Sequence, residues 1–293
     1  MNIISVISLL RPLQWVKNVF IFIPLFFSGN LLSASMWLKA IVVFTCFSLV
    51  ASGIYCLNDL KDIEADKLHP IKKFRPLASG QLPVATAVAI MIVLLIGGLG
   101  IAWFGLPHSR AAFLIIATYL VLNVTYCFKL KQIAIIDVFI VSLGFVFRIL
   151  AGGLTCGIWI SPWLICMTFL LALFLSFAKR RDDVVLMENK GIIVRKNIIG
   201  YNLNFLNQTL GIIGAMTMMS YIMYTVSPEV IARLGSDYVY ISAIFVLAGI
   251  LRYLQVALVD LKSGSPTKIL MKDRFIQMTI LCWLITFITI IYL

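Results

Sequence analysis

Four acidic side chains crowd into the nine residues Asn58-Asp59-Leu60-Lys61-Asp62-Ile63-Glu64-Ala65-Asp66, at the end of an apolar segment. Asp59, Asp62 and Asp66 stand at positions i, i+3 and i+7, so a helix would present their carboxylates on one face. Carboxylates this close repel one another unless a cation lies between them, and Mg²⁺ prefers one or two carboxylates completed by substrate phosphates. We therefore predict a magnesium site; a solvated loop beside the membrane is the alternative. The predicted metal ligands are Asn58, Asp59, Asp62 and Asp66.

A basic loop follows the acidic stretch, from His69 to Gly80, and its two prolines and one glycine favour a fixed turn over a helix. Arg makes directional, bidentate contacts with phosphate, whereas Lys acts as a point charge. Acidic side chains that hold a metal, followed by basic side chains that hold phosphate, together predict a Mg²⁺–diphosphate site. The alternative is that these cations only fix the orientation of the chain in the membrane. The predicted catalytic residues are Asp59, Asp62, Lys73 and Arg75.

Other polar side chains lie at the ends of apolar segments or inside them. Lys17 and Asn18 close the stretch Arg11-Pro12-Leu13-Gln14-Trp15-Val16-Lys17-Asn18, in which Trp15 suits a membrane interface. Arg148 lies inside an apolar segment, where an ionisable side chain is costly and is taken as functional. For each of these positions a membrane-end anchor or a structural ion pair is the alternative. The predicted substrate-binding residues are Lys17, Asn18, Lys72, Lys129, Arg148, Lys179 and Arg180.

Four further features are less specific. Asp137 lies near Lys129 and Lys131 in the sequence, and we expect it beside them. Arg252 lies inside an apolar segment, and we expect it to face the same cavity as the predicted site. The loop from Ser263 to Thr267 has the composition of a lid or a phosphate-contacting turn. Asp182 and Asp183 could add a second metal contact, which the sequence leaves open.

The composition predicts a polytopic helical membrane protein, because 62% of the residues are hydrophobic and only 12% are charged. Most of the apolar segments reach the length of about 20 residues that crosses a bilayer. No loop is long enough to hold a core of its own, so we expect one membrane domain over 1–293. The nine predicted segments are 19–33, 38–57, 84–106, 111–128, 133–154, 162–178, 205–226, 238–259 and 275–293.

The distribution of basic residues predicts an orientation. Most of the 24 Lys and Arg lie in the N-terminus and in the loops after segments two, four, six and eight, while the opposite loops hold Lys39, Arg110 and Arg233. By the positive-inside rule the basic loops are cytoplasmic and the C-terminus is outside. Membrane topology and phosphate binding account for the net charge of +12 without nucleic acid. The six cysteines show no metal or redox spacing and suit the membrane core.

The pattern Asn58-Asp59-x-x-Asp62-x-x-x-Asp66 resembles that of the UbiA superfamily of intramembrane prenyltransferases. The resemblance covers the whole chain and implies an all-α bundle with a central cavity open to the cytoplasmic side. It also implies a Mg²⁺-dependent transferase that holds a diphosphate with two Asp-rich motifs. The chain departs from the second motif, since it has Ala178-Lys179-Arg180-Arg181-Asp182-Asp183 in its place.

Additional motifs resemble one branch of this superfamily, which transfers phosphoribosyl groups to polyprenyl phosphates. They are the stretch 11–18, His69-Pro70, Arg75-Pro76, Lys179-Arg180 and Lys272-Asp273-Arg274. This resemblance implies phosphoribosyl pyrophosphate as donor, a decaprenyl-like phosphate as acceptor, pyrophosphate as leaving group and a role in bacterial cell-wall synthesis at the inner membrane.

Two other functions stay open. A prenyltransferase acting on an aromatic acceptor of quinone or haem synthesis would use a prenyl diphosphate. A transporter or flippase would need broken helices and polar residues near the midplane, whereas the charges here cluster at one membrane face. The chain length of the lipid and the oligomeric state are also open, with a homo-oligomer among the options.

Overall fold

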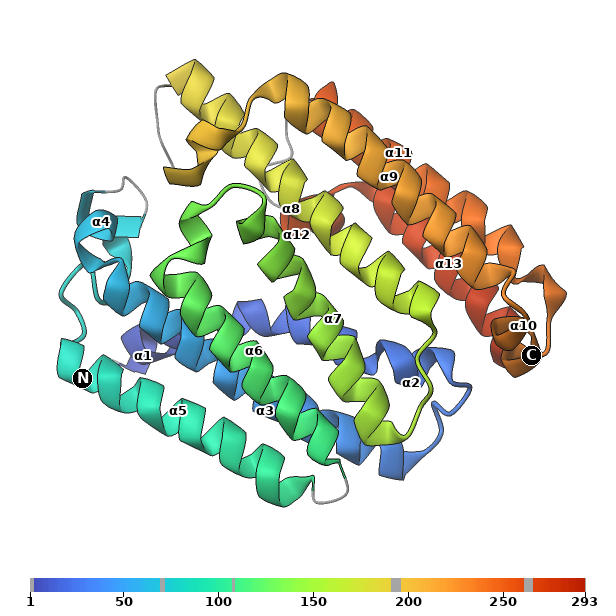
Figure 1. Cartoon of the computed structure of the whole chain (residues 1–293), viewed down its shortest axis with the longest axis horizontal. Coiled ribbons are helices and arrows are strands. Elements are labelled where there is room, and N and C mark those ends of the chain that lie inside the picture. Colours follow the sequence, from blue (N-terminus) through green and yellow to red (C-terminus); the bar gives the residue numbers. More distant parts are fainter. Residues whose placement is uncertain (1–2, 69–71, 107–108, 191–195, 261–265, 293) are drawn as a thin grey trace. The chain divides into compact units, whose positions relative to one another are not determined.

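The computed structural model describes residues 3–68, 72–106, 109–190, 196–260 and 266–292. Within these ranges all regular secondary structure is helical, as predicted (Figure 1). The segments His69–Ile71, His108 and Ser263–Ser265, which include parts of the predicted basic loop and lid, lie outside the described residues.

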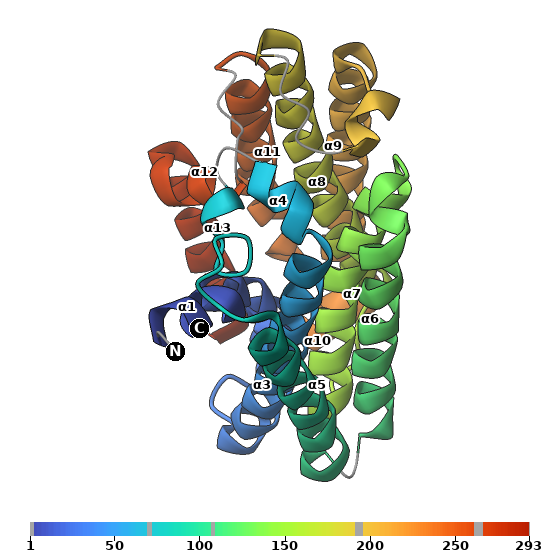
Figure 2. The ribbon, with the colours of Figure 1, turned by 90° about the vertical axis from the view of Figure 1, so that its left-hand side faces the viewer.

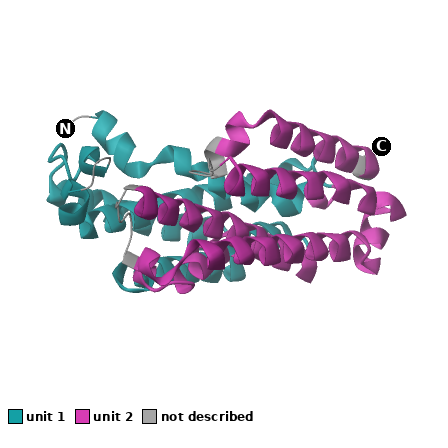
Figure 3. Cartoon of the chain, turned by 90° about the horizontal axis from the view of Figure 1, so that it is seen from above, with its two compact units in different colours: residues 1–26, 30–130, 147–159 teal, residues 27–29, 131–146, 160–293 magenta. Residues whose placement is uncertain are grey.

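The chain divides into two compact units whose segments alternate along the sequence (Figure 3). Unit 1 comprises Met1–Phe26, Asn30–Leu130 and Phe147–Trp159; unit 2 comprises Phe27–Gly29, Lys131–Val146 and Ile160–Leu293. Each unit is described by itself below. The single domain over 1–293 stays a prediction.

Unit 1 is built around a long helix, α3, which contacts α5, α6, α1 and the 3₁₀ helix η1. Figures 1 and 2 show α3 and α5 side by side. Phe47, Val50 and Ile54 of α3 are buried, and they pack with Ile116 and Tyr119 of α6. The elements are α1 (Ile3–Leu10), η1 (Pro12–Phe22), α2 (Ile23–Phe27), α3 (Ala34–Lys61), α4 (Ile63–Leu68), η2 (Lys72–Phe74), α5 (Val84–Gly105) and α6 (Arg110–Phe128). The last residue of α2 belongs to unit 2, and η3 (Leu130–Gln132) begins at the end of unit 1 and continues into unit 2.

Helix α7 (Ile136–Cys156) contributes its first part to unit 2 and its last part to unit 1. In unit 2, α8 packs along α9, and α11 packs against α13 and α9. Phe174, Phe177, Leu206 and Tyr253 belong to its buried core. The remaining elements are α8 (Pro162–Lys190), η4 (Lys196–Gly200), α9 (Leu203–Thr225), α10 (Pro228–Leu234), η5 (Asp237–Ser242), α11 (Ala243–Leu258), α12 (Pro266–Lys272) and α13 (Arg274–Tyr292).

Seven helices in the described ranges are long and apolar enough to cross a membrane. The pair α9 and α10, bent by 56°, would make an eighth span, and Arg274–Ile290 forms a shorter apolar helix. The chain is therefore an integral membrane protein, while nine spans stay a prediction.

The first predicted segment, 19–33, is placed wrongly. The helical stretch runs from Ile3 to Phe27, because the mostly apolar helix α1 continues into η1 after a break at Arg11.

Candidate active site

The acidic motif does not form one continuous helix as expected. Helix α3 ends at Lys61, and Asp62 occupies its C-cap with its N–H bonded to the Asn58 carbonyl at 3.0 Å. Asp62 has φ −98° and ψ 9°, outside the helical range, so α3 is interrupted there and α4 starts as a separate helix at Ile63. The break changes which carboxylates converge, because the i, i+3, i+7 rule holds only along a straight helix.

Asp59 and Asp66 converge on a single cation, the guanidinium of Arg75. Its Nη1 lies 3.0 Å from Oδ1 of Asp59 and 2.6 Å from Oδ2 of Asp66. Lys72 Nζ lies 4.0 Å from the other oxygen of Asp66. The carboxylates of Asp59 and Asp66 are only 2% and 4% exposed, whereas the Arg75 side chain is 25% exposed. The anions are therefore fixed in the protein, and the cation that joins them lies toward the solvent.

Arg11 is a second cation at this cluster, and its role was not predicted from the sequence. Its Nη2 donates to the same Oδ1 of Asp59, and its guanidinium lies 5.1 Å from the centre of the Tyr55 ring. Arg11 and Asp59 are 48 residues apart. No local spacing in the sequence links the Arg11-Pro12 dipeptide to the acidic motif.

Four other predicted residues of this unit are less buried than Asp59 and Asp66. Asn58 and Asp62 are half-buried, and both make contacts. Lys73 and Lys129 are exposed, and Lys73 Nζ lies 5.2 Å from the Phe74 ring centre. Among the described residues, no group of three or more His, Cys, Asp or Glu is arranged to hold a metal ion.

The donor set nevertheless fits magnesium. The Asp59 and Asp66 carboxylates meet on one cationic group, and Mg²⁺ needs only one or two carboxylates when phosphates and water complete its shell.

Asn18 and Arg148 form a buried polar network in unit 1. Arg148 Nε donates to Asn18 Oδ1 at 2.7 Å, and its Nη2 donates to the Tyr119 hydroxyl at 3.2 Å. Asn18 Nδ2 donates to Ser48 Oγ at 2.9 Å. Asn18 is 1% exposed and Arg148 is 5% exposed, while Lys17 beside them is half-buried. The network ties η1 to three helices, and the substrate-binding role of these residues stays a prediction.

Unit 2 contains its own buried ion network at the end of α8. Arg180 Nε donates to Asp137 Oδ2 at 2.6 Å, and its Nη1 lies 3.4 Å from Asp183. The Tyr201 hydroxyl donates to Asp137 at 3.2 Å; burial raises the pKa of this phenol to about 12, so it stays protonated. Asp137 thus pairs with Arg180, which lies 43 residues further along the chain.

The neighbouring Arg181 donates to other partners than Arg180 does. Arg181 donates to Asn207 and to the carbonyl of Ala257, and Lys179 is exposed. Which ligands Lys179 and Arg180 contact, and whether Asp182 or Asp183 meets a metal, remain open predictions.

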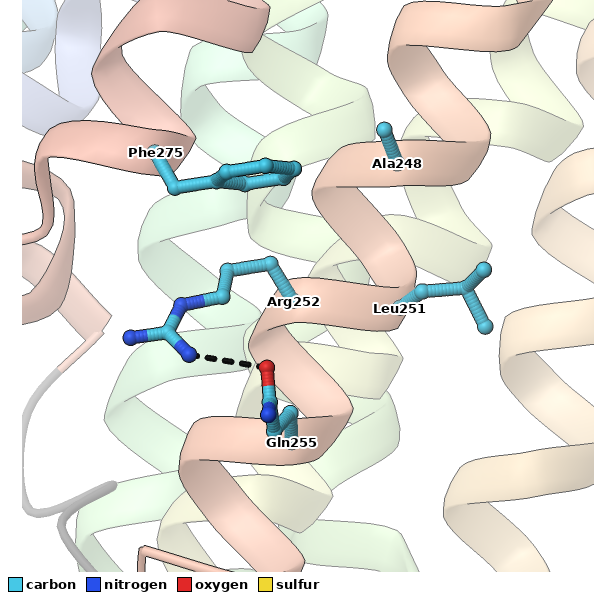
Figure 4. A pocket seen from close by; sticks show the side chains of 5 residues that line it. All are labelled: Ala248, Leu251, Arg252, Gln255 and Phe275. Carbon is cyan, nitrogen blue, oxygen red and sulfur yellow. Dashed lines mark hydrogen bonds between the residues drawn. The ribbon is translucent and has the colours of Figure 1, made fainter.

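Arg252 lines a cavity of about 470 Å³ within unit 2 (Figure 4). Two of its nitrogens donate to Asp273 Oδ2 at 3.0 and 2.9 Å, and a third donates to Gln255 at 2.8 Å. Ala248, Leu251 and Phe275 give the cavity an apolar lining. The guanidinium of Arg252 is thus bound to the carboxylate of Asp273.

Residues 19–283 match the model of the UbiA prenyltransferase family. The chain belongs to this family. It is 31% identical to decaprenyl-phosphate phosphoribosyltransferase of Corynebacterium glutamicum, covering 99% of this chain and 87% of the relative. It is 33% identical to the enzyme of the same name from Mycolicibacterium smegmatis, covering 99% and 94%. The UbiA resemblance seen in the motifs is confirmed, and the protein is a transferase.

The UbiA fold is also seen in a solved structure. A UbiA homologue from Archaeoglobus fulgidus, bound to GPP and Mg²⁺, superposes with a TM-score of 0.70 at 17% identity, covering 99% of this chain and 100% of the other. At this identity the likeness establishes the fold alone.

Proposed function

We propose that this UbiA-family transferase moves the 5-phosphoribosyl group of phosphoribosyl pyrophosphate onto a polyprenyl phosphate of the decaprenyl type and releases pyrophosphate. The observation that carries the proposal is the convergence of Asp59 and Asp66 on Arg75, with Arg11 and Lys72 beside them. This arrangement suits a divalent metal and a diphosphate. The choice of donor and acceptor is supported by the near full-length relatives that carry the phosphoribosyltransferase name.

Asp59 and Asp66 would hold Mg²⁺. Asn58 and Asp62, which belong to the same acidic motif, are the other two predicted ligands. When bound, the metal would neutralise charge on the departing pyrophosphate and make it a better leaving group. The protein contributes two carboxylates that are already fixed and desolvated, so little reorganisation is needed during the reaction.

Arg75 would move from the carboxylates to the diphosphate when metal and donor bind. It is partly exposed and provides several N–H groups in a planar fork, which matches the oxygens of a phosphate. Lys72 and Lys73 both belong to η2, the short element directly before Arg75, and they would add point charges around the leaving group. All three would stabilise negative charge that grows as the bond at ribose C1 breaks.

The acceptor needs no strong general base, because a lipid phosphate oxygen is already anionic when it attacks C1. The residues that would position the lipid phosphate or the ribose 5-phosphate must therefore be cationic or hydrogen-bonding rather than basic catalysts. Our candidates for these contacts are Lys17, Asn18, Lys129, Arg148, Lys179 and Arg180.

We also propose that the site faces the cytoplasm of a bacterial inner membrane, with the C-terminus outside. The acidic motif begins in the last turn of α3 and the basic loop comes after it, on the side where the positive-inside rule places the cytoplasm. A polyprenyl phosphate would then reach the site from the inner leaflet.

Transfer of a prenyl group to an aromatic acceptor is the second candidate function. It is favoured by the UbiA homologues that are bound to DMAPP or GPP together with Mg²⁺. The same carboxylates and cations would serve it, because both donors carry a diphosphate.

The deciding experiment supplies membranes containing the protein with labelled phosphoribosyl pyrophosphate and a polyprenyl phosphate, first with Mg²⁺ and then with EDTA. We expect a lipid-soluble phosphoribosyl product only with the metal. Asp59→Asn should abolish it, whereas Asp237→Asn, on the exposed first turn of η5, should not. Transfer from a prenyl diphosphate to an aromatic acceptor instead would establish the second candidate.

A further inference from the structure

Arg11 has an unusual backbone conformation at the junction between α1 and η1. Its φ of 52° and ψ of 56° place it in the left-handed region, which a side chain with a Cβ rarely adopts. Pro12 follows as the first residue of η1. The Arg11 guanidinium reaches Asp59 from this position, so the direction of its side chain depends on contacts that hold the backbone.

One buried hydroxyl contacts the chain on both sides of Arg11. Ser52 Oγ, on α3, donates to the carbonyl oxygen of Leu10 at 2.8 Å and accepts from Trp15 Nε1 at 3.0 Å. Ser52 is 0% exposed. We call these three residues, Ser52, Leu10 and Trp15, the Ser52 clasp.

The clasp differs from most hydroxyl contacts in the apolar helices. Thr45 Oγ1 donates to the carbonyl of Ile41, and Ser142 Oγ donates to that of Val138, both four residues earlier in the same helix. Such bonds are local and position nothing outside their helix. Ser52 instead bonds residues that are 42 and 37 positions away in the chain.

The contacts beyond the clasp fix the register of η1 along α3. A 3₁₀ helix rises about 2.0 Å per residue, so three residues advance about 6 Å. Four residues of an α-helix, at about 1.5 Å each, advance the same distance. Trp15 and Asn18 are three apart on η1, and their partners Ser52 and Ser48 are four apart on α3. The spacing of the two contacts along η1 therefore equals their spacing along α3, at about one turn of each helix.

The same spacing recurs on α7. Asn18 and Ile21 are three apart on η1, and they meet Arg148 and Gly152, which are four apart. A Cβ on Gly152 would lie 2.1 Å from the Ile21 carbonyl oxygen, so only glycine permits this approach. These matched contacts fall within η1, which keeps 3₁₀ geometry over 11 residues, although runs longer than three or four residues are uncommon.

We infer that Ser52 is a positioning residue of the site: through Leu10 and Trp15 it holds the left-handed backbone of Arg11, so that the guanidinium lies on Asp59. Arg11 in turn sets how much of the Asp59 charge is available to a metal. The inference rests on the proposed function only for the metal-binding role of Asp59; the coupling of Ser52 to Arg11 is independent of it.

The first test is a double-mutant cycle on thermal stability without ligand. The variants are Ser52→Ala, Arg11→Gln and the pair of both, and the matched control is Ser142→Ala with and without Arg11→Gln. We expect the Ser52 pair to lose less stability than the two single variants together, because the second change removes a contact that the first has already loosened. The Ser142 pair should be additive. Additivity in the Ser52 pair would overturn the inference.

The second test measures the affinity of the full-length protein for Mn²⁺ in the absence of diphosphate. Arg11→Gln and Ser52→Ala should each raise it about fivefold, and the double variant no further, because each frees charge on Asp59. A merely structural lesion would lower the affinity, and Ser142→Ala should leave it unchanged. Trp15→Phe, which removes the other half of the clasp, should resemble Ser52→Ala.

The two tests separate the two claims. If the stability losses of Ser52→Ala and Arg11→Gln are not additive, but all variants bind Mn²⁺ with equal affinity, the clasp is supported and the metal role of Asp59 is rejected. A raised affinity in Arg11→Gln, without one in Ser52→Ala or Trp15→Phe, would support the metal role and overturn the clasp.

Discussion

Arg75 occupies the position between Asp59 and Asp66 that the proposed metal would need. Two nearly buried carboxylates cannot remain close without a cation, and the guanidinium supplies one from its half-exposed position. The metal must therefore compete with Arg75, and a diphosphate would relieve that competition by giving Arg75 a new anionic partner. Metal and diphosphate should bind cooperatively for this reason.

Arg75→Met tests this competition. Without diphosphate the variant should bind Mn²⁺ about tenfold more tightly, whereas inorganic pyrophosphate should bind about tenfold more weakly and lose its cooperativity with the metal. Isothermal titration with each ligand, alone and with the other present, measures both effects. Lys67→Met removes a neighbouring cation whose ion pair within the described part of the chain is with the exposed Glu64, and it should leave both affinities unchanged. Equal Mn²⁺ affinity in Arg75→Met and the parent would show that Arg75 does not block the site.

The acidic motif was found from the sequence because its residues are close along the chain. Three contacts of buried polar side chains were not predicted, because Arg11 lies 48 residues from Asp59, Asn18 lies 130 residues from Arg148, and Asp137 lies 43 residues from Arg180. Only packing brings such pairs together, so local spacing cannot reveal them.

At the scale of the elements, the approach of η1 to α7 depends on one glycine. An alanine at Gly152 would force its Cβ against the Ile21 carbonyl oxygen, and overpacking of this kind costs about 1–3 kcal/mol. Gly97 on α5 has open space around its Cβ position, so alanine there should instead stabilise the helix by about 0.5–1 kcal/mol. Thermal unfolding of Gly152→Ala and Gly97→Ala should therefore shift in opposite directions. Equal shifts would contradict the close contact between η1 and α7.

The contact between α11 and α13 should depend on pH. The hydrogen bond from Arg252 lowers the pKa of Asp273, whose other oxygen accepts from the N–H of Ile276 at the start of α13. A carboxyl with a lowered folded-state pKa contributes stability above its unfolded value of about 4, and this is lost as the pH falls through the folded value. Unfolding between pH 6 and 3, as a rough range, should show this loss, and Arg252→Gln should reduce it. An unchanged pH dependence in that variant would rule out the pair as its cause.

The apolar runs of the sequence predicted most helices of the whole molecule, because a span must be both long and apolar. The start of the first helix was missed, since Arg11 and Pro12 interrupt the pattern while η1 continues in 3₁₀ geometry. The break at Asp62 was missed for a related reason: the residues on both sides of it favour a helix, and only the C-cap geometry ends α3 there.

The orientation of the whole chain in the membrane can be tested with two single cysteines in a background that lacks the six native ones. Lys39 and Lys129 are both exposed and belong to unit 1, but the distribution of basic residues places Lys39 outside and Lys129 in the cytoplasm. In intact cells, a membrane-impermeant maleimide should label Lys39→Cys and should reach Lys129→Cys only after the membrane is opened. Inverted vesicles should give the reverse pattern. The reverse result in both preparations would place the acidic motif and its basic loop on the outer face, where a cytoplasmic sugar diphosphate could not reach them, and would therefore also count against the proposed donor.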